Sequence, residues 1–281
     1  MIGTLLLQTL ALAIPYVLAA LGGVFSERGG VINIALEGML LTGAFFAALG
    51  AHAGGTTLGL VAAVGASAAL AGLHGLLCVR FRADHVAAGL GINLLASGLT
   101  RFLLMACFDS ASNSPMLPGM GQGVLASPML WGTIILVALS HVALARTPFG
   151  LRLRAAGEHP QAAHSLGVPV DRVKICGVIA SGALAGLGGA FLALDNHQFT
   201  AEMSAGRGYI ALAAVIFGKW RPVPVAAACL LFAFADALQI ELQAVLSGYK
   251  QFVQILPYAL TLAVLAGFIG RSRPPAALGA R

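Results

Sequence analysis

The chain has 281 residues, of which 16 are Lys or Arg and 10 are Asp or Glu, so only 9% carry a charge. Soluble domains carry about 25% charged residues. Hydrophobic residues (59%) and 36 glycines together make up about 72% of the chain, which excludes an ordinary soluble domain and a disordered segment. Four cysteines, each within an apolar run, do not make a disulfide scaffold. The composition predicts an all-α polytopic membrane protein.

The net charge of +6 does not indicate a nucleic-acid partner, because the basic residues are scattered between apolar stretches instead of gathering on one face. The first apolar run has no Lys or Arg before it, and the hydrophobicity continues after it. We therefore expect this run to be a retained span and not a cleaved signal peptide.

Apolar runs near the roughly 20 residues that cross a bilayer predict nine transmembrane helices, within an expected range of eight to ten. The seventh is short and is interrupted by Gly206-Arg207-Gly208. In chain order the predicted spans are Thr4–Gly23, Val31–Leu49, Thr57–Cys78, His85–Cys107, Met129–Ala145, Ile175–Leu194, Met203–Phe217, Val225–Ile240 and Phe252–Gly270.

The basic residues predict the orientation of these spans. Nine alternating spans place 13 of the 16 Lys and Arg residues on the same side of the membrane, leaving only Arg101, Arg207 and Lys250 elsewhere. Since cytoplasmic connections are enriched in Lys and Arg, we predict an external N-terminus and a cytoplasmic C-terminus.

Small residues dominate the stretch 180–190, and small residues allow close approach of helix backbones, so we interpret this stretch mainly as a helix-packing surface, with a substrate-lining role as the alternative. A weak internal echo relates the sequence around residues 28–36 to that around 207–212. In the predicted topology the two copies start on opposite sides of the membrane, as they would in an inverted repeat.

The longest hydrophilic connection, residues 146–174, is predicted to be cytoplasmic. Pro160 suits the first position of a helix and Gly167 the position just after its end, so Gln161–Leu166 is predicted to be a short helix. A docking element and a plain connecting loop both fit this pattern. His159 and His164 lack neighbouring ligands and do not indicate a metal site.

The sequence resembles the permease subunits of ATP-binding cassette (ABC) importers for branched-chain amino acids, ribose and nucleosides. Residues 15–270 carry the resemblance. The stretches 19–39 and 206–214 are similar to the nucleoside branch, which works with a basic membrane lipoprotein, whereas 89–95 and 150–158 are typical of the wider family.

The resemblance implies a type II importer fold that forms a single permease domain over residues 1–281, in a bacterial inner membrane. It also implies a second permease subunit, expected to be a paralogue, a cytosolic ATPase and an extracytoplasmic substrate-binding lipoprotein. The helix that couples to the ATPase is expected within residues 154–167. Its candidate residues are Gly157, Glu158, His159, Pro160, Ala162, Ala163 and Gly167.

No enzymatic chemistry is predicted for this chain. None of its three lysines lies in a Gly-x-x-x-x-Gly-Lys-Ser/Thr phosphate-binding loop, so ATP and Mg²⁺ are expected on the partner ATPase and no cofactor or metal on this chain. An ion-driven secondary transporter would instead need several intramembrane ionisable groups. Glu37, Arg101 and Asp236 are the candidates, with a structural role expected for Glu37 and an Asp236–Arg101 pair as a simple explanation for the other two.

A nucleoside pathway needs a few amides and hydroxyls among apolar faces. Asn33, Asn93 and Ser97 are the candidates, and the last two share one helical face. Each would equally serve as an interhelical hydrogen-bonding group. The sequence predicts an importer of nucleosides, with purine nucleosides favoured, and leaves ribose or another simple sugar as the alternative substrate.

Overall fold

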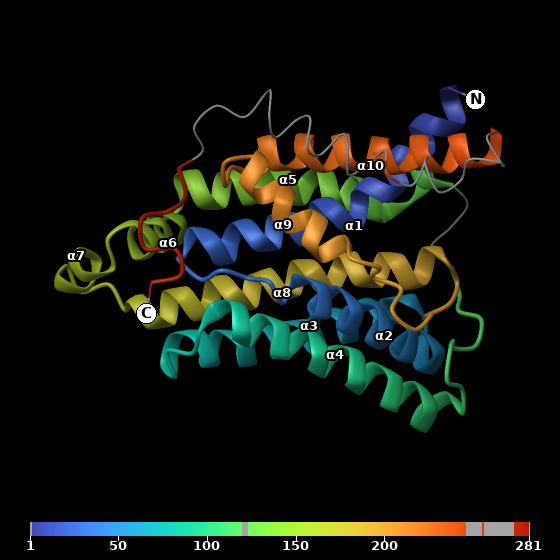
Figure 1. The fold of residues 1–281 in the computed structure, drawn as a ribbon, viewed down its shortest axis with the longest axis horizontal. Helices are drawn as coiled ribbons and strands as arrows, with labels where there is room; N and C mark the ends of the chain where they lie inside the picture. The colour runs from blue at the N-terminus through green and yellow to red at the C-terminus, as the bar shows by residue number, and fades with distance from the viewer. Residues whose placement is uncertain (1, 120–122, 246–254, 256–272, 281) are drawn as a thin grey trace.

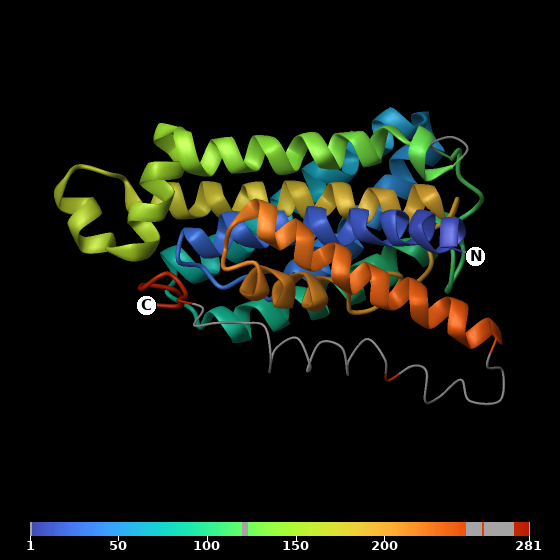
Figure 2. The ribbon, with the colours of Figure 1, turned by 90° about the horizontal axis from the view of Figure 1, so that it is seen from above.

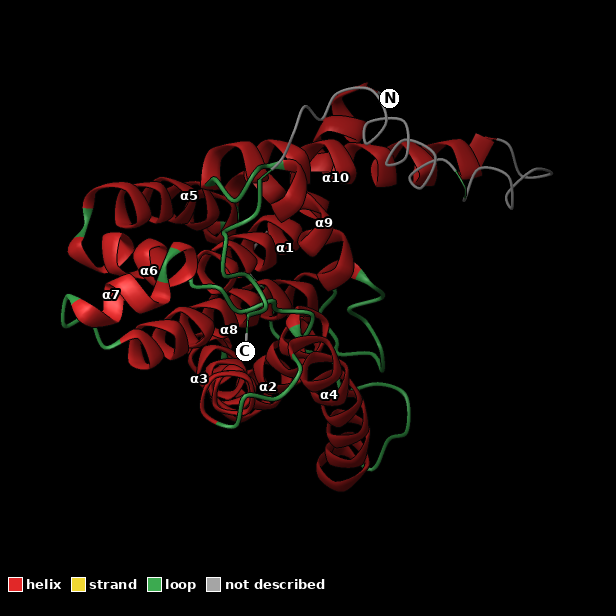
Figure 3. Cartoon of the chain, turned by 60° about the vertical axis from the view of Figure 1, so that its left-hand side comes forward, coloured by secondary structure: helices red, strands yellow, loops and turns green. Residues whose placement is uncertain are grey.

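The computed structural model describes residues 2–119, 123–245, 255 and 273–280. Figures 1 and 3 show long helices lying side by side in an elongated bundle. Over the described ranges the one extended pairing is an isolated antiparallel bridge between Asn113 and Thr200. The predicted all-α class is confirmed.

Seven of the described helices are long and apolar enough to cross a membrane. Each overlaps a predicted span, with bounds that differ from the prediction by at most five residues, and α2 begins five residues later than predicted. The seven are α1 (Ile2–Arg28), α2 (Leu36–Gly54), α3 (Thr56–Gly75), which continues into the π-helical turn η1 (Leu76–Arg80), α4 (His85–Phe108), α5 (Pro128–Arg146), α8 (Val170–Asp195) and α10 (Pro222–Val245).

The start of α2 corrects the predicted span Val31–Leu49. The chain between α1 and α2 is not helical: Gly30 has φ +90°, and the Ser26 hydroxyl donates to the carbonyl of Val31 at 2.8 Å. A positive φ is readily accessible only to glycine, so Gly30 separates the two helices and α2 begins at Leu36.

A second correction concerns the predicted span Met203–Phe217. The helix there, α9, covers only Arg207–Phe217, which is about 16 Å at 1.5 Å per residue, roughly half of a 30 Å hydrocarbon core. Apart from Ile255, the ninth predicted span, Phe252–Gly270, lies outside the described residues. The count of nine therefore stays a prediction.

The alternation of the helices brings most of the basic connections to one end of the bundle, which we call the α7 end because it carries α6 (Pro148–Glu158) and α7 (Pro160–Ser165). In Figure 2, α6 and α7 project beyond the long helices at this end. Arg28 contacts both Glu158 and the carbonyl of Trp220 there. The predicted gathering of basic connections on one side is confirmed for the described chain.

The centre of the bundle is α8, which packs against α1, α2 and α3. Its glycines lie against neighbouring backbones: a Cβ added at Gly189 would lie 2.0 Å from the carbonyl oxygen of Leu40, and one at Gly186 would lie 2.7 Å from that of Ala63. We call this contact, formed by Gly182, Gly186 and Gly189, the α8 seam. The interpretation of this stretch as a helix-packing surface is confirmed.

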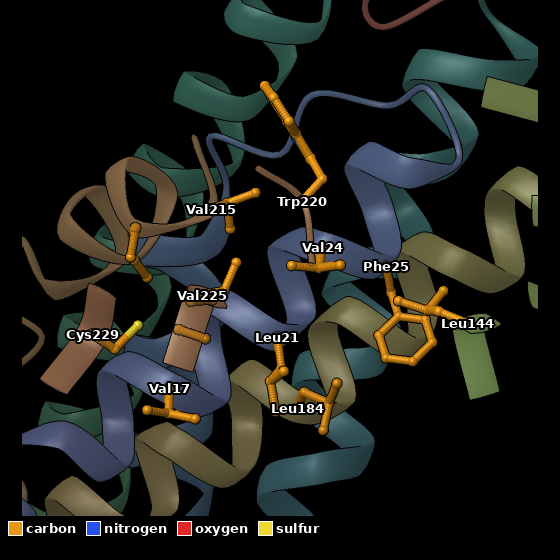
Figure 4. Close-up of a cluster of buried hydrophobic side chains, with 14 of the residues drawn as sticks. Val17, Leu21, Val24, Phe25, Leu144, Leu184, Val215, Trp220, Val225 and Cys229 are labelled. Atoms are coloured by element: carbon orange, nitrogen blue, oxygen red, sulfur yellow. The ribbon is translucent and has the colours of Figure 1, made fainter. Parts of the chain in front are cut away.

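Large apolar side chains fill the space on the other side of α8. Figure 4 shows Val17 and Leu21 of α1 beside Leu184 of α8, with Val215 of α9 and Val225 of α10 in the same cluster. In a membrane such packing stabilises the bundle chiefly through van der Waals contact. It fixes α9 and α10 against α1, and so sets the position at which α9 begins.

Candidate functional site

Two interrupted helices start side by side part-way along the bundle. The carboxylate of Glu37, in the first turn of α2, accepts hydrogen bonds from the backbone N–H groups of Gly206 (2.8 Å) and Gly208 (2.7 Å) at the start of α9. The first N–H groups of a helix have no partner within it, and negative charge is favourable there. The side chain of Glu37 therefore caps the N-terminus of α9 by accepting hydrogen bonds from the backbone N–H groups there.

Asn93 of α4 does the same for α2. Its side-chain oxygen accepts from the N–H of Gly38 at 2.8 Å, and its Nδ2 donates to the carbonyl of Ile34 at 3.0 Å and to the hydroxyl of Tyr209 at 3.1 Å. One amide thus joins α4, α2 and α9. A side chain added at Gly208 would clash with the backbone of Glu37, at 2.4 Å, so the two helix starts are packed as closely as glycine allows.

Ser97 and Arg101 lie one and two turns beyond Asn93 on the same face of α4, and both contact Glu202. The Ser97 hydroxyl donates to Glu202 Oε1, and Arg101 Nη2 lies 3.2 Å from the same oxygen. The side chains of Arg101 and Glu202 are 61% and 48% exposed. We call Glu37, Asn93, Ser97, Arg101, Glu202 and Tyr209 together the mid-depth cluster.

The cluster lies at membrane depth. Asn93 is eight residues, or about 12 Å, from the start of α4, which is about 36 Å long. An ionisable pair at such a depth is costly against lipid and is expected to face water or protein. The exposed side of the mid-depth cluster is therefore a candidate pathway or subunit-facing surface.

The segment that carries Glu202 returns from the end of α8 to this depth without forming a helix. Its backbone pairs with residues 112–114: Ser114 N donates to Phe199 O at 2.9 Å, and Ala201 N donates to Ser112 O at 2.8 Å. Irregular backbone is tolerated at membrane depth only where protein buries it or where it lines a water-filled cavity. Glu202 itself has φ +61°, a conformation that L-residues rarely adopt.

The remaining candidates lie apart from this cluster. Asn33 is fully buried in the non-helical chain between α1 and α2 and donates to the Ser181 hydroxyl of α8 at 2.8 Å, a packing contact that is the alternative to a substrate role. Asp236 accepts from the Tyr16 hydroxyl. The predicted Asp236–Arg101 pair does not form, because Arg101 contacts Glu202 on the α4 side while Asp236 packs between α10 and α1.

The connection 146–174 contains two helices where we predicted one. α7 begins at Pro160 and is followed by Gly167 at φ +79°, as the sequence indicated. The additional helix, α6, was missed, although Thr147-Pro148 gives it a regular start: the Thr147 hydroxyl accepts from the N–H of Gly150 at 3.1 Å.

The coupling candidates divide into a buried and an exposed group. Gly157 is buried and leaves no room for a side chain, since a Cβ there would lie 2.1 Å from the carbonyl oxygen of Arg28. Ala163 is also buried, whereas Ala162 is exposed. Pro160 is half-buried. The exposed candidates are His159, Ala162 and Gly167, which lie in α7 or within two residues of its ends, and Leu166 beside them is 84% exposed.

A C-terminal strap, residues 273–280, crosses the base of α6. The N–H of Ala276 donates to the Glu158 carboxylate at 3.1 Å, that of Ala277 to the carbonyl of Gly157 at 2.9 Å, and that of Gly279 to the carbonyl of Gly30 at 3.0 Å. Glu158 therefore contacts the strap, while its side chain remains 44% exposed.

Comparison with known proteins gives the family. Residues 5–265 match the branched-chain amino acid transport system / permease component family. The chain belongs to this family. It is 39% identical to the guanosine ABC transporter permease protein NupQ of Bacillus subtilis, over 96% of this chain and 93% of the relative.

Two further relatives of this permease carry different substrate names. The nucleoside ABC transporter permease protein NupC of Lactococcus lactis is 36% identical, over 94% of this chain and 92% of the relative. The putative glucose ABC transporter permease protein TsgC13 of Haloferax volcanii is 32% identical, over 93% and 90%. The B. subtilis matches also include a second guanosine permease, NupP.

Sequence analysis of this permease missed Glu202 and Tyr209. Glu202 lies between the predicted spans Ile175–Leu194 and Met203–Phe217, where no pattern singles it out. Tyr209 lies in the stretch 206–214 that carries the family resemblance. It also lies within residues 207–212, which echo residues 28–36, and this echo is the one signal in the sequence that singles out its position. That echo coincides with the two helix starts joined by Glu37 and Gly208.

Proposed function

We propose that this chain is the membrane-spanning permease subunit of an ABC importer and forms the translocation path for nucleosides, with purine nucleosides as the favoured substrates. The observation that carries the proposal is the mid-depth cluster, where polar side chains are exposed between two interrupted helices. In membrane transporters, such interrupted helices mark substrate sites near the bilayer midplane. The names of NupQ and NupC supply the substrate class.

The chemistry of the cluster suits a neutral, hydroxylated solute. Its exposed groups are an amide, hydroxyls and an ion pair with no net charge, flanked by apolar α4 residues such as Leu94 and Phe102. A nucleoside presents a flat base and a polyhydroxyl ribose, which together need apolar faces and a few convergent polar groups. The proposed pathway residues are Asn93 and Ser97, whereas the burial of Asn33 supports a role in helix packing.

The proposed assembly closes the exposed side of the cluster with a second permease, expected to be a paralogue since B. subtilis supplies two guanosine permeases among the relatives. Cytosolic ATPases carry ATP and Mg²⁺ and supply all the enzymatic chemistry, and an extracytoplasmic lipoprotein captures the substrate. The permease itself is a single domain that is non-catalytic.

We place the α7 end in the cytoplasm of a bacterial inner membrane, with the C-terminus inside. The support is the excess of Lys and Arg in the connections at that end. In this orientation α7 is the element that docks on the ATPase, because it projects from the bundle and presents Ala162 and Leu166 outward.

Uptake of radiolabelled guanosine, adenosine and ribose tests the substrate class. Cells with and without this gene are compared, with the neighbouring ATPase and lipoprotein genes present in both. Loss of guanosine and adenosine uptake alone supports the proposal. Loss of ribose uptake alone contradicts it and favours the sugar alternative, to which the name of TsgC13 also points.

An ion-coupled secondary transporter is the alternative of a different class. It would require uptake that follows a proton or sodium gradient and continues without the ATPase. Uptake that stops when the ATPase is removed, while the membrane potential is held, excludes this alternative.

The docking role of α7 is tested by Ala162→Arg. A long charged side chain on the outer face of α7 is expected to lower co-purification with the ATPase and substrate-stimulated hydrolysis by about tenfold, comparable to the loss of one well-packed contact. Gln161→Arg, which adds the same charge at the neighbouring residue, is the control for the effect of charge alone. Normal hydrolysis in Ala162→Arg contradicts the docking role.

A further inference from the structure

We infer that Glu202, held by Ser97 and Arg101, is the binding site for the vicinal diol of a ribosyl substrate. The inference rests on the proposed function and adds to it a specific site and a specific group of the solute. It concerns a residue that sequence analysis did not single out.

The geometry of Glu202 leaves half of its carboxylate available. Both the Ser97 hydroxyl and Arg101 Nη2 contact Oε1. Oε2 has no hydrogen-bonding partner among the described residues, and the side chain is 48% exposed. The carboxylate is therefore anchored through one oxygen while the other presents its lone pairs to the exposed side of the cluster.

A vicinal diol matches this arrangement better than a charged solute does. Each hydroxyl both donates and accepts, so one hydroxyl can donate to Oε2 while its neighbour accepts from the guanidinium of Arg101, which is 61% exposed. An isolated carboxylate at membrane depth would favour a cation. The Arg101–Glu202 pair carries no net charge, and so favours a neutral ligand with adjacent donor and acceptor groups.

The surroundings extend the site to the length of a nucleoside. Tyr209 is 45% exposed and accepts a hydrogen bond from Asn93. Asn93 lies one turn of α4 from Ser97, so this contact is about 6 Å from Ser97 along the axis of α4. The ring of Tyr209 offers a flat surface for a base, and flat rings stack favourably on aromatic side chains. The ribose hydroxyls would meet Glu202 while the base lies toward Tyr209.

The positive φ of Glu202 supports the view that its side chain is held in a fixed position for binding. The residue has φ +61° in a segment fixed to residues 112–114 by backbone hydrogen bonds. Non-glycine residues in such conformations are uncommon and cluster at functional sites. The conformation keeps the side chain toward α4 at the depth of Ser97.

The experiment compares guanosine, 2′-deoxyguanosine and 3′-deoxyguanosine as substrates. The complete importer, with its lipoprotein, both permeases and the ATPase, is reconstituted in proteoliposomes, and KM and kcat for ATP-driven uptake are measured for each nucleoside. We expect the wild type to favour guanosine over both deoxynucleosides by at least about tenfold in kcat/KM, because a site built to bind a hydroxyl rejects an analogue that lacks it.

Glu202→Gln is the decisive variant. Ser97 and Arg101 are both donors, so they hold the amide oxygen at the position of Oε1 and turn the NH₂ group toward the diol. The hydroxyl would then accept from the NH₂ group instead of donating to a carboxylate. A hydrogen bond between neutral groups is about half as strong as one to an ionised group, so the preference for guanosine is expected to fall to about threefold. Glu202→Asp restores part of the preference, and Glu241→Gln on α10, a carboxyl-to-amide change outside the cluster, leaves it unchanged.

Two results overturn the inference. One is an equal loss of uptake for all three nucleosides in Glu202→Gln, which indicates a structural ion pair only. The other is equal uptake of all three by the wild type. If Glu202→Gln fails to assemble, Ser97→Ala is measured in its place, since it keeps the carboxylate and removes only one anchor. A wild-type importer that assembles and hydrolyses ATP but moves no nucleoside contradicts the proposed function itself.

Discussion

The α8 seam and the mid-depth cluster lie at similar depths in the same bundle and are built on opposite principles. In the seam, glycines bring continuous helices together until their backbones touch, and the contact consists of backbone atoms and small side chains such as Ala71 and Ser67. In the cluster, two helices are interrupted and their exposed ends are held by the side chains of Glu37 and Asn93. The seam provides rigidity, whereas the cluster places polar groups where a solute can reach them.

The largest effect is expected from Gly189→Val in the seam. Its Cβ would lie 2.0 Å from the carbonyl oxygen of Leu40, and a backbone atom within a buried helix has little freedom to move away. We expect a loss of more than about 3 kcal/mol and no recovery of monodisperse protein. Thermal unfolding and size-exclusion chromatography in detergent measure this. Gly132→Ala on α5, where no atom lies within 4 Å, is the control and should remain folded.

Glu37→Gln is expected to come next. The carboxylate accepts from two N–H groups, but an amide has only one oxygen and turns a donor toward the other N–H. The cost is about 1–3 kcal/mol, seen as a lower melting temperature of the purified permease. Glu241→Gln supplies the matched comparison. An unchanged melting temperature would show that the helix starts do not depend on this carboxylate.

Asn93→Leu is expected to lower transport by about tenfold, the equivalent of about 1.4 kcal/mol, because it removes the amide that joins three helices. Binding of the nucleoside by the purified lipoprotein should not change. Uptake and lipoprotein binding are measured side by side. Unchanged uptake would show that transport does not depend on this amide and would remove Asn93 from the pathway.

Asp236→Asn is expected to have the smallest effect. The amide oxygen still accepts the Tyr16 hydroxyl, so stability should change by less than about 1 kcal/mol. ATP-driven uptake should stay within about twofold of the wild type. Loss of uptake together with loss of sensitivity to the proton gradient would support the ion-coupled alternative.

The seam and the long helices were predictable because they depend on composition and periodicity. Apolar runs placed the bounds of the seven long helices to within five residues, and the Gly- and Ala-rich stretch indicated close packing of α8. Pro160 and Gly167 gave the bounds of α7 since both residues act through their own backbone preferences. These features are local, and local sequence determines them.

The cluster was only partly predictable because its contacts join distant segments. Asn93 and Ser97 were identified as polar residues on one helical face, but their partners Tyr209 and Glu202 are more than 100 residues away in the chain. The sequence indicates the interruption at Gly206-Arg207-Gly208, but not that the backbone before it turns and that α9 begins only at Arg207. The role of Glu37 as a helix cap for another segment leaves no local pattern.

The C-terminal strap has a practical consequence for handling the protein. Three of its backbone N–H groups bind Glu158, Gly157 and Gly30, so the last described residues form part of the base of α6. An affinity tag fused after Arg281 would place foreign polypeptide beside the strap and α7. A tag fused before Ile2, at the opposite end of the bundle in Figure 1, avoids this surface and is the better choice for purification.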